Sequence, residues 1–390
     1  MTSDADIVGA NAERSRSHNR QVVLERVRKE GQIGRAEIAR GSGLSTQAVS
    51  NIIADLLEDG LISEQGRRAG MRGLPPVQYG LNPGGGFAIG IEIRPDAVFA
   101  AVIDLCGRPM ATRRYALSET DLDGVTRTVC AITQDVTRDA KVPEGRILGA
   151  GIVMPGPFGP TGLSGTGSEL PIFYDVSPAD WFQDALDLPV VVENDANAAA
   201  VAERMSGVAK DLETYAFLYF GNGLGLGVVQ NGRLVTGAFG NAGEIGHIPV
   251  SAGGRVVRLE SMLSRLSVQK HLAASGEAVD SSDGLARAFS AESPALMTWL
   301  DAASEPLSTA IAVIENMLDP EAVILGGAMP DAIFNHLIGS VELVERSVAR
   351  RDGRTVPRLM RGASGRMTAT LGGAALVINR AFTPRIAATV

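Results

Sequence analysis

Hydrophobic and polar residues follow two different periods along this chain, and the change of period divides it into two parts. Between residues 17 and 61, apolar residues recur at helical spacing, which predicts short amphipathic helices. From residue 87 onward, apolar runs of strand length alternate with helical segments. We therefore expect a small helical unit followed by a larger α/β body.

Residues 35–61 are predicted to form two helices joined by a tight turn at 41–43. Ser45 stands where the second helix needs an N-cap, because its hydroxyl can accept a backbone N–H. The apolar residues expected to face inward are Val49, Ile52, Ile53, Leu56 and Leu57. The opposite face, near the helix start, would present Thr46, Gln47, Ser50 and Asn51, with Ser45 beside them as a further candidate for DNA contact. Such a face suits base edges in a DNA major groove, although a plain helical hairpin has the same pattern.

A β-hairpin is predicted after the second helix, with strands at 61–65 and 76–81. Its glycine-rich tip carries Arg67, Arg68 and Arg72, which could lie along phosphates or enter a minor groove. These arginines could instead belong to a solvated loop, but the neighbouring helix-turn-helix favours the DNA role. With a further helix over 17–29, residues 17–81 would form a winged helix-turn-helix DNA-binding domain.

The remaining chain is expected to be a two-lobed body. NPGGG at 82–86 is interpreted as a flexible linker, and the polar segment 1–16 as a disordered tail. Strands are expected at 87–93, 97–105, 110–117, 147–154, 189–194, 214–220, 225–230, 233–238 and 322–327. Helices are expected at 121–139, 196–205, 258–273, 281–290, 295–317, 330–350 and 371–382. Strands feeding helices twice over indicate two similar lobes, 87–210 and 211–390, with ligands bound between them.

Composition limits the function classes. The net charge is −8, yet the first 80 residues carry 11 Lys and Arg against 10 Asp and Glu. The acidic excess therefore lies in the body, and DNA contact belongs to the front domain. Two cysteines, Cys106 and Cys130, provide neither a disulfide framework nor a Cys-x-x-Cys metal signature. With no signal peptide and no apolar run of bilayer length, a cytoplasmic location is expected.

The motif VVENDANAAA at 191–200 places Asp195 where a predicted strand meets a helix. A carboxylate there could take a proton from a substrate hydroxyl or accept its hydrogen bond. Alternatively, Asn194 or Asp195 could simply cap the helix. The motif therefore has one catalytic, one binding and one structural interpretation.

A second motif, GNAGEIGH at 240–247, places Glu244 and His247 three residues apart in a turn, able to converge on one polyol. Alternatively, Glu244 and His247 could be ordinary surface residues, or they could provide half of the ligands of a metal site. The glycine-rich segments at 220–232 and 325–330 support phosphate or ligand binding only weakly, because glycine-rich hairpins are common.

In this order, these motifs resemble the ROK family of bacterial repressors and sugar kinases, over about 17–385. The family belongs to the actin-like and hexokinase-like superfamily. The resemblance implies an α/β protein with an N-terminal winged helix-turn-helix and a two-lobed actin-like (ribonuclease H-like) ATPase or sugar-kinase fold. It implies that the sugar-contacting positions are Asn194, Asp195, Glu244, His247 and Glu260. Asp195 also stands at the position of the kinase catalytic base.

The chain departs from the kinase pattern at both phosphate loops. The family's Asp-x-Gly-Gly-Thr type loop corresponds to GIEIRPDAV, where Glu92 retains a carboxylate. Arg94 and Pro95 replace small residues that allow phosphate to approach the backbone. Asn222 stands where the second loop usually has Thr. ATP binding and kinase activity are therefore not expected, and Asp195 would be a vestigial base.

Two further departures concern zinc and sugar specificity. Family members often carry a Cys-x-Cys-Gly-x-x-Gly-Cys segment between the positions of His247 and Glu260, but this chain has no cysteine there. A structural zinc is therefore not expected. Glu169 replaces an Asn that usually contacts the sugar, so the ligand could differ from common hexoses.

These features together predict a sugar-responsive transcriptional regulator, a repressor of carbohydrate uptake or catabolism genes. Its partners would be operator DNA, a sugar or sugar-derivative effector, and further copies of itself in a homodimer or homotetramer. An active ATP-dependent carbohydrate kinase with a DNA-binding appendage is the first alternative. A constitutive DNA-binding protein with a vestigial pocket is the second.

Overall fold

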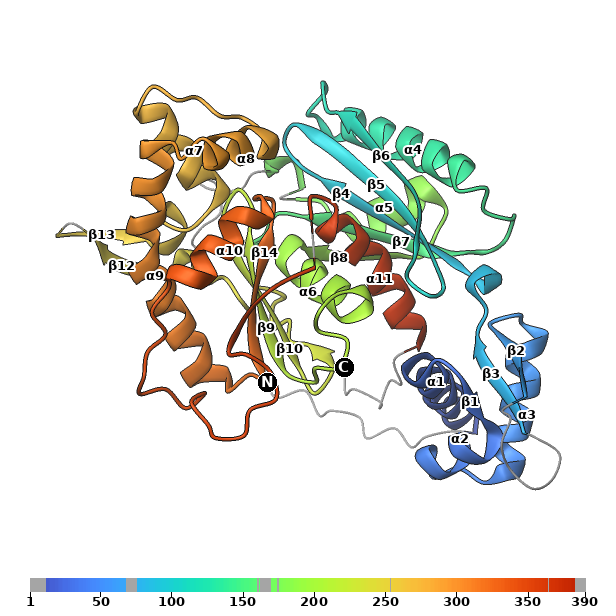
Figure 1. The fold of residues 1–390 in the computed structure, drawn as a ribbon. Coiled ribbons are helices and arrows are strands. Elements are labelled where there is room, and N and C mark those ends of the chain that lie inside the picture. The colour runs from blue at the N-terminus through green and yellow to red at the C-terminus, as the bar shows by residue number, and fades with distance from the viewer. Residues whose placement is uncertain are drawn as a thin grey trace, which may run out of the picture.

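The computed structural model describes residues 12–67, 76–159, 161, 170–173, 175–252, 254–363 and 365–382. These residues form a small N-terminal domain attached to a two-lobed α/β body (Figure 1). No helix in these ranges is long and apolar enough to cross a membrane. The main helices and strands follow the order that the hydrophobic pattern predicts, with several short elements added.

The N-terminal domain contains three helices and a small three-stranded sheet of order β1-β3-β2. The helices are α1 (Ala12–Glu30), α2 (Arg35–Ser42) and α3 (Thr46–Glu58). The strands are β1 (Ile33–Gly34), β2 (Ile62–Arg67) and β3 (Val77–Leu81). Helix α1 begins ahead of the predicted residue 17, so the expectation of disorder is wrong for residues 12–16. The predicted turn between α2 and α3 is confirmed, with Gly43 in the left-handed conformation at φ 71°.

The expected flexible linker at 82–86 is instead packed against the N-terminal domain. The Asn82 side chain accepts from the Gly84 N–H and donates to the Gly60 carbonyl at 2.8 Å. Gly85 is buried so closely that a Cβ there would lie 2.4 Å from the same carbonyl. The Arg146 guanidinium donates to the Gly85 carbonyl at 3.3 Å. Buried glycine therefore serves close packing here and not chain flexibility.

The first lobe is a five-stranded sheet of order β6-β5-β4-β7-β8. Its strands are β4 (Phe87–Ile93), β5 (Ala97–Asp104), β6 (Pro109–Ala116), β7 (Ile147–Met154) and β8 (Val190–Asn194). The first three form an antiparallel meander, and β7 and β8 run parallel to β4. The other elements of this part are η1 (Pro83–Gly85), α4 (Leu122–Asp139), η2 (Pro171–Phe173), α5 (Pro178–Leu186) and α6 (Asp195–Ser206). Helix α5 was not predicted, although Ser177 and Pro178 form a typical helix start.

The second lobe repeats the arrangement with a sheet of order β11-β10-β9-β14-β15. Its strands are β9 (Tyr215–Phe220), β10 (Leu224–Gln230), β11 (Arg233–Leu234), β14 (Ala322–Gly327) and β15 (Leu359–Arg361). A separate hairpin joins β12 (Pro249–Ala252) to β13 (Arg255–Arg258). The helical elements are η3 (Ile245–His247), η4 (Leu259–Ser261), α7 (Arg265–Ala274), α8 (Ser282–Ser290), α9 (Pro294–Leu318) and α10 (Asp331–Ser340). The last helix, α11 (Thr368–Phe382), returns to the first lobe and packs against β4 and β7.

Three predicted boundaries in this lobe are wrong, because tertiary contacts replace helical or strand hydrogen bonds. Helix α7 begins at Arg265 and not at residue 258, since the preceding chain pairs with β12 and then forms η4. Helix α10 ends at Ser340, well before residue 350, and the Ser304 hydroxyl bonds the Ser340 carbonyl. Strand β11 covers only two of the residues expected at 233–238. Strand β15 was not predicted.

Helices α6 and α11 pack against each other between the two sheets, and α11 also lies against β4 and β7 (Figure 1). Glycine permits this close contact. A Cβ at Gly90 would lie 1.8 Å from the Thr370 carbonyl, and one at Gly372 would lie 1.9 Å from the Ala198 carbonyl. The centre of the body is therefore a tightly packed layer that also touches α1.

Candidate functional site

A cleft of about 520 Å³ lies between the two lobes, a size typical of small-molecule sites. The first lobe contributes the ends of β4, β7 and β8 and the start of α6. The second lobe contributes the β9–β10 turn, η3, η4 and the start of α7. Five of the six predicted sugar-contacting residues line this cleft: Asn194, Asp195, Glu244, His247 and Glu260. The sixth, Glu169, lies outside the described residues.

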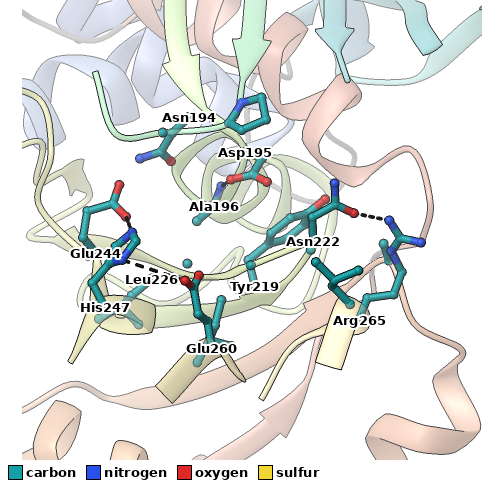
Figure 2. A pocket seen from close by; sticks show the side chains of 18 of the residues that line it. Asn194, Asp195, Ala196, Tyr219, Asn222, Leu226, Glu244, His247, Glu260 and Arg265 are labelled. Atoms are coloured by element: carbon teal, nitrogen blue, oxygen red, sulfur yellow. Dashed lines mark hydrogen bonds and ion pairs between the residues drawn. The ribbon is translucent and has the colours of Figure 1, made fainter. Parts of the chain in front are cut away.

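Asn194 and Asp195 stand at the start of α6, where β8 ends (Figure 2). The Asn194 side-chain oxygen caps the helix by accepting from the Asn197 N–H at 2.7 Å, so the capping interpretation is right for that atom. Buried Glu193 orients this junction by accepting from the Asn194 N–H and the Asn197 amide, both at 2.9 Å. Burial raises the pKa of Glu193, although both hydrogen bonds act in the opposite direction. Asp195 is half-buried and lines the cleft.

Across the cleft, His247 lies between two carboxylates (Figure 2). Its Nε2 is 3.5 Å from Glu244 Oε2, and its Nδ1 is 3.9 Å from Glu260 Oε1. Burial raises the pKa of Glu244, which His247 lowers and Glu260 raises further. The three side chains are each about one quarter exposed, so a ligand can reach them. Carboxylates and an imidazole in this arrangement match the donors and acceptors of a polyol.

The β12–β13 hairpin positions two members of this cluster. His247 ends the turn before β12, and Glu260 follows β13 directly. The two strands pair from Pro249 opposite Arg258, and the Leu259 N–H then donates to the Ile248 carbonyl at 3.0 Å. The hydrogen-bonded hairpin therefore holds the two candidate side chains next to each other.

The loop that corresponds to the family's first phosphate loop is occupied by an arginine. The Arg94 guanidinium donates to buried Glu92 at 2.6 Å and lies 4.4 Å from the centre of the Phe99 ring. The other Glu92 oxygen accepts from the Thr370 hydroxyl at 2.6 Å. Burial lowers the pKa of the Arg94 guanidinium. The nearby negative charges, above all that of Glu92, raise it by more, so the pKa lies above its ordinary value. Glu92 is therefore fully engaged with protein groups.

The structure adds polar residues to the cleft that the motifs did not identify: Tyr219, Arg258, Arg265 and Lys270. The Arg265 guanidinium bonds the Asn222 side chain of the β9–β10 turn and Gln269. Burial raises the pKa of Tyr219 well above its ordinary value. Arg258, Arg265 and Lys270 follow the GNAGEIGH motif in the sequence, but no local pattern marks them as part of a site.

The polar face of α3 is exposed as predicted. Gln47 and Asn51 are exposed, and their side chains hydrogen-bond to each other at 3.1 Å. Thr46 is also exposed, and the Ser50 hydroxyl donates to the Thr46 carbonyl at 2.9 Å. Ser45 acts as the N-cap by accepting from the Ala48 N–H at 3.2 Å.

The inward face of α3 carries the domain core. Val49, Ile52, Ile53 and Leu56 are buried, whereas Leu57 is partly buried and packs against the same core. Of the predicted wing arginines, Arg67 ends β2, and Arg68 and Arg72 lie outside the described residues. The plain helical hairpin is excluded as a complete description, because β2 and β3 form the stem of a wing beside α3.

Comparison with known proteins agrees with this architecture. The model of the ROK family matches residues 88–380, and a winged helix-turn-helix DNA-binding model matches residues 16–63. An uncharacterized protein of Sinorhizobium fredii is 27% identical over 83% of this chain and 82% of its own length. The xylose repressor of Bacillus subtilis is 26% identical over 60% of this chain, and the alignment spans 61% of that repressor. The dual regulator NagC of Escherichia coli is 26% identical over 64% of this chain and 62% of its own length.

Solved structures show the same fold. A ROK family transcriptional regulator, a homologue of the Escherichia coli MLC protein, superimposes with a TM-score of 0.73 at 21% identity, covering 95% of this chain and 97% of the other. A ROK family glucokinase from Streptomyces griseus, in complex with glucose and AMPPNP, has a TM-score of 0.58 at 22% identity, covering 75% and 99%. An N-terminal winged helix-turn-helix is thus followed by the two-lobed sugar-kinase fold, and the chain belongs to the ROK family.

Proposed function

We propose that this protein is a sugar-responsive, DNA-binding transcriptional repressor of carbohydrate uptake or catabolism genes. The observation that carries the proposal is a cleft lined by four carboxylates and a histidine, in one chain with a winged helix-turn-helix whose Gln47 and Asn51 side chains are exposed. Relatives named xylose repressor and NagC support the same regulatory function. The effector would bind between the lobes and favour one arrangement of them, which changes operator affinity.

The proposal is tested by measuring operator affinity with and without sugars. Operator sequences are first selected from random DNA with the full chain, and binding is then followed by fluorescence anisotropy. A panel that includes xylose, glucose and N-acetylmannosamine is screened by thermal shift, and each stabilising sugar is added to the operator complex. A sugar that stabilises the protein and changes operator affinity supports the proposal. Failure of every sugar would favour the constitutive DNA-binding alternative.

We infer that the protein does not phosphorylate the ligand in the cleft, because side chains of the protein itself occupy the first phosphate loop. Arg94 and Glu92 bind each other there, and Pro95 removes a backbone N–H. A phosphate would have to displace the partly buried Arg94 guanidinium, which would leave the buried Glu92 carboxylate without its ion-pair partner. Purified protein with ATP and each stabilising sugar is expected to yield no sugar phosphate, with a ROK glucokinase as the positive control. Phosphorylation that Asp195→Asn abolishes would establish the kinase alternative.

We infer further that no zinc ion holds the cleft together. The residues between His247 and Glu260 provide no thiolate, imidazole or carboxylate, so a tetrahedral site cannot be completed from this segment. The β12–β13 hairpin supplies the positioning that a metal would otherwise provide. Treatment with EDTA is therefore expected to leave both the thermal midpoint and sugar affinity unchanged. A loss of either that added Zn²⁺ restores would contradict this inference.

The repressor is expected to act as a symmetric oligomer. A single winged helix-turn-helix reads one half-site, and palindromic operators require two such domains related by a twofold axis. We propose a homodimer or homotetramer on this ground. Multi-angle light scattering of the full chain, alone and with operator DNA, measures the number of copies directly.

A further inference from the structure

An ion-paired carboxylate joins the N-terminal domain to the second lobe. Glu213, in the segment between α6 and β9, receives the Lys29 ammonium of α1 at 3.0 Å on one oxygen. Its other oxygen lies 3.6 Å from the Arg204 guanidinium of α6. The hydrogen bond from Lys29 lowers the pKa of Glu213 against the effect of burial, and Arg204 lowers it further. One carboxylate therefore contacts the last turn of α1 and the last turn of α6.

The backbone of Glu213 is fixed to the second lobe. The N–H groups of Glu213 and Thr214 both donate to Glu321, at 2.7 and 2.8 Å, immediately before β14. The Glu213 carbonyl accepts from the Gly232 N–H at 2.7 Å, in the β10–β11 turn. These contacts tie Glu213 to the two segments that flank β9 in the sheet. Any displacement of the second lobe must therefore displace the Glu213 carboxylate.

The N-terminal domain, in contrast, is fastened to the first lobe. The Arg146 guanidinium, just before β7, donates to the Asp59 carbonyl at 3.0 Å, and Gly85 packs against Gly60. Apolar side chains of α1 and α3 share one core with residues of β4, β5 and α11. The domain is thus attached mainly to the first lobe. Lys29 supplies its ion pair to the second lobe, where Leu234 of β11 also packs against the shared core.

Helix α6 connects this contact to the cleft. It begins at Asp195, which lines the cleft, and carries Arg204 nine residues later, about 14 Å along the axis. The helix is buried from Ala196 to Glu203, and Gly372 of α11 packs directly on its backbone. A helix confined in this way transmits displacement as a rigid unit.

We propose that Glu213 is a positioning residue, through which the second lobe sets the orientation of the DNA-binding domain according to the state of the cleft. The inference rests on the proposed function, in which a sugar changes the arrangement of the lobes. In this structure, the ion pair of Lys29 with Glu213 holds the N-terminal domain against the second lobe. When the lobes rearrange around a sugar, the Lys29–Glu213 contact changes, because Lys29 belongs to the domain attached to the first lobe and Glu213 belongs to the second lobe.

The test uses Lys29→Gln, Glu213→Gln and the double variant in the full chain, with Lys210→Gln as a matched control. Lys210 is an exposed lysine close in sequence to Glu213 and has no ion pair among the described residues. An exposed ion pair of this kind supports a change of about two- to fivefold. Each single variant is expected to reduce the sugar-induced change in operator affinity by that factor. The double variant is expected to equal Glu213→Gln alone, since the Lys29 contact is already lost there, whereas Glu213→Gln also weakens the contact with Arg204.

The thermal midpoint is expected to change little in these variants, because neither residue belongs to the core. Sugar affinity is expected to change by no more than the same factor of about two- to fivefold, because neither residue lines the cleft and both act only through the coupled arrangement of the lobes. A lowered midpoint with an intact sugar response would indicate a merely structural ion pair and overturn the proposal. Additive losses in the double variant would overturn it as well.

A second measurement separates this proposal from the proposed function. If wild-type protein responds to no sugar, amide hydrogen exchange at the end of α1 is compared in the free proteins. Faster exchange in Lys29→Gln and Glu213→Gln, but not in Lys210→Gln, would support the contact as the element that holds the domain. Unchanged exchange would overturn the role of Glu213 independently of any effector.

Discussion

Replacing Glu244 and His247 together by alanine is expected to abolish the sugar response while operator binding remains. Both side chains lie on the second-lobe wall of the cleft, with His247 Nε2 3.5 Å from Glu244 Oε2. Each charge-assisted hydrogen bond to a ligand contributes about 1.5–3 kcal/mol, so losing two weakens sugar binding by at least about a hundredfold. Calorimetry with a stabilising sugar measures this loss, and anisotropy measures operator affinity.

The control for this experiment removes the same residue types from the second lobe outside the cleft. Glu305 is exposed on α9, and His336 is partly buried on α10, and neither lines the cleft. Glu305→Ala with His336→Ala is expected to retain the sugar response. If Glu244→Ala with His247→Ala instead destroyed operator binding as strongly as changes in α3 do, the proposed division between sensing and DNA binding would be wrong.

Replacing Gln47 and Asn51 by alanine is expected to weaken specific operator binding with the fold intact. The two amides are exposed on α3 and bonded to each other, so they are presented to DNA as one polar unit. A good contact with a base pair contributes about 1–3 kcal/mol, which corresponds to roughly a tenfold to hundredfold loss of affinity. Anisotropy with specific and random DNA measures both affinities.

Non-specific binding and its salt dependence should change little in this variant, because phosphate contacts are retained. Gln134→Ala with Asn316→Ala serves as the control, since both residues are exposed on helices of the body. An equal loss on specific and random DNA would show that Gln47 and Asn51 do not read bases. A lowered thermal midpoint would show that the effect comes from the fold.

Local signals in the sequence predicted most of the elements. Helix α3 was placed correctly because Ser45 caps it and its apolar residues recur at helical spacing. Strands such as β4 and β9 were recognised as continuous apolar runs, and both are buried along their whole length. Errors occurred at short strands such as β13 and β15, because a strand of three or four residues carries little periodic signal.

The candidate site was predicted in the same uneven way. Motifs identified Asp195, Glu244 and His247, because each stands at a junction with a recognisable local pattern. Arg265 was missed, since an arginine at a helix start has no meaning until the fold brings it to the cleft. The sequence predicted that Arg94 and Pro95 disrupt the first phosphate loop. It did not predict the hydrogen bond from Thr370 to Glu92, because these residues are 278 positions apart.

By itself, the sequence determined which segments are helices and strands, where α2 and α3 turn, and which polar residues stand at functional junctions. These properties depend on backbone conformation and side-chain period within a few residues, so they are encoded locally. The tertiary structure alone decided that residues 82–86 are packed and that Lys29 meets Glu213 over a separation of 184 residues. Such contacts depend on how separate surfaces fit together, and local pattern does not specify that fit.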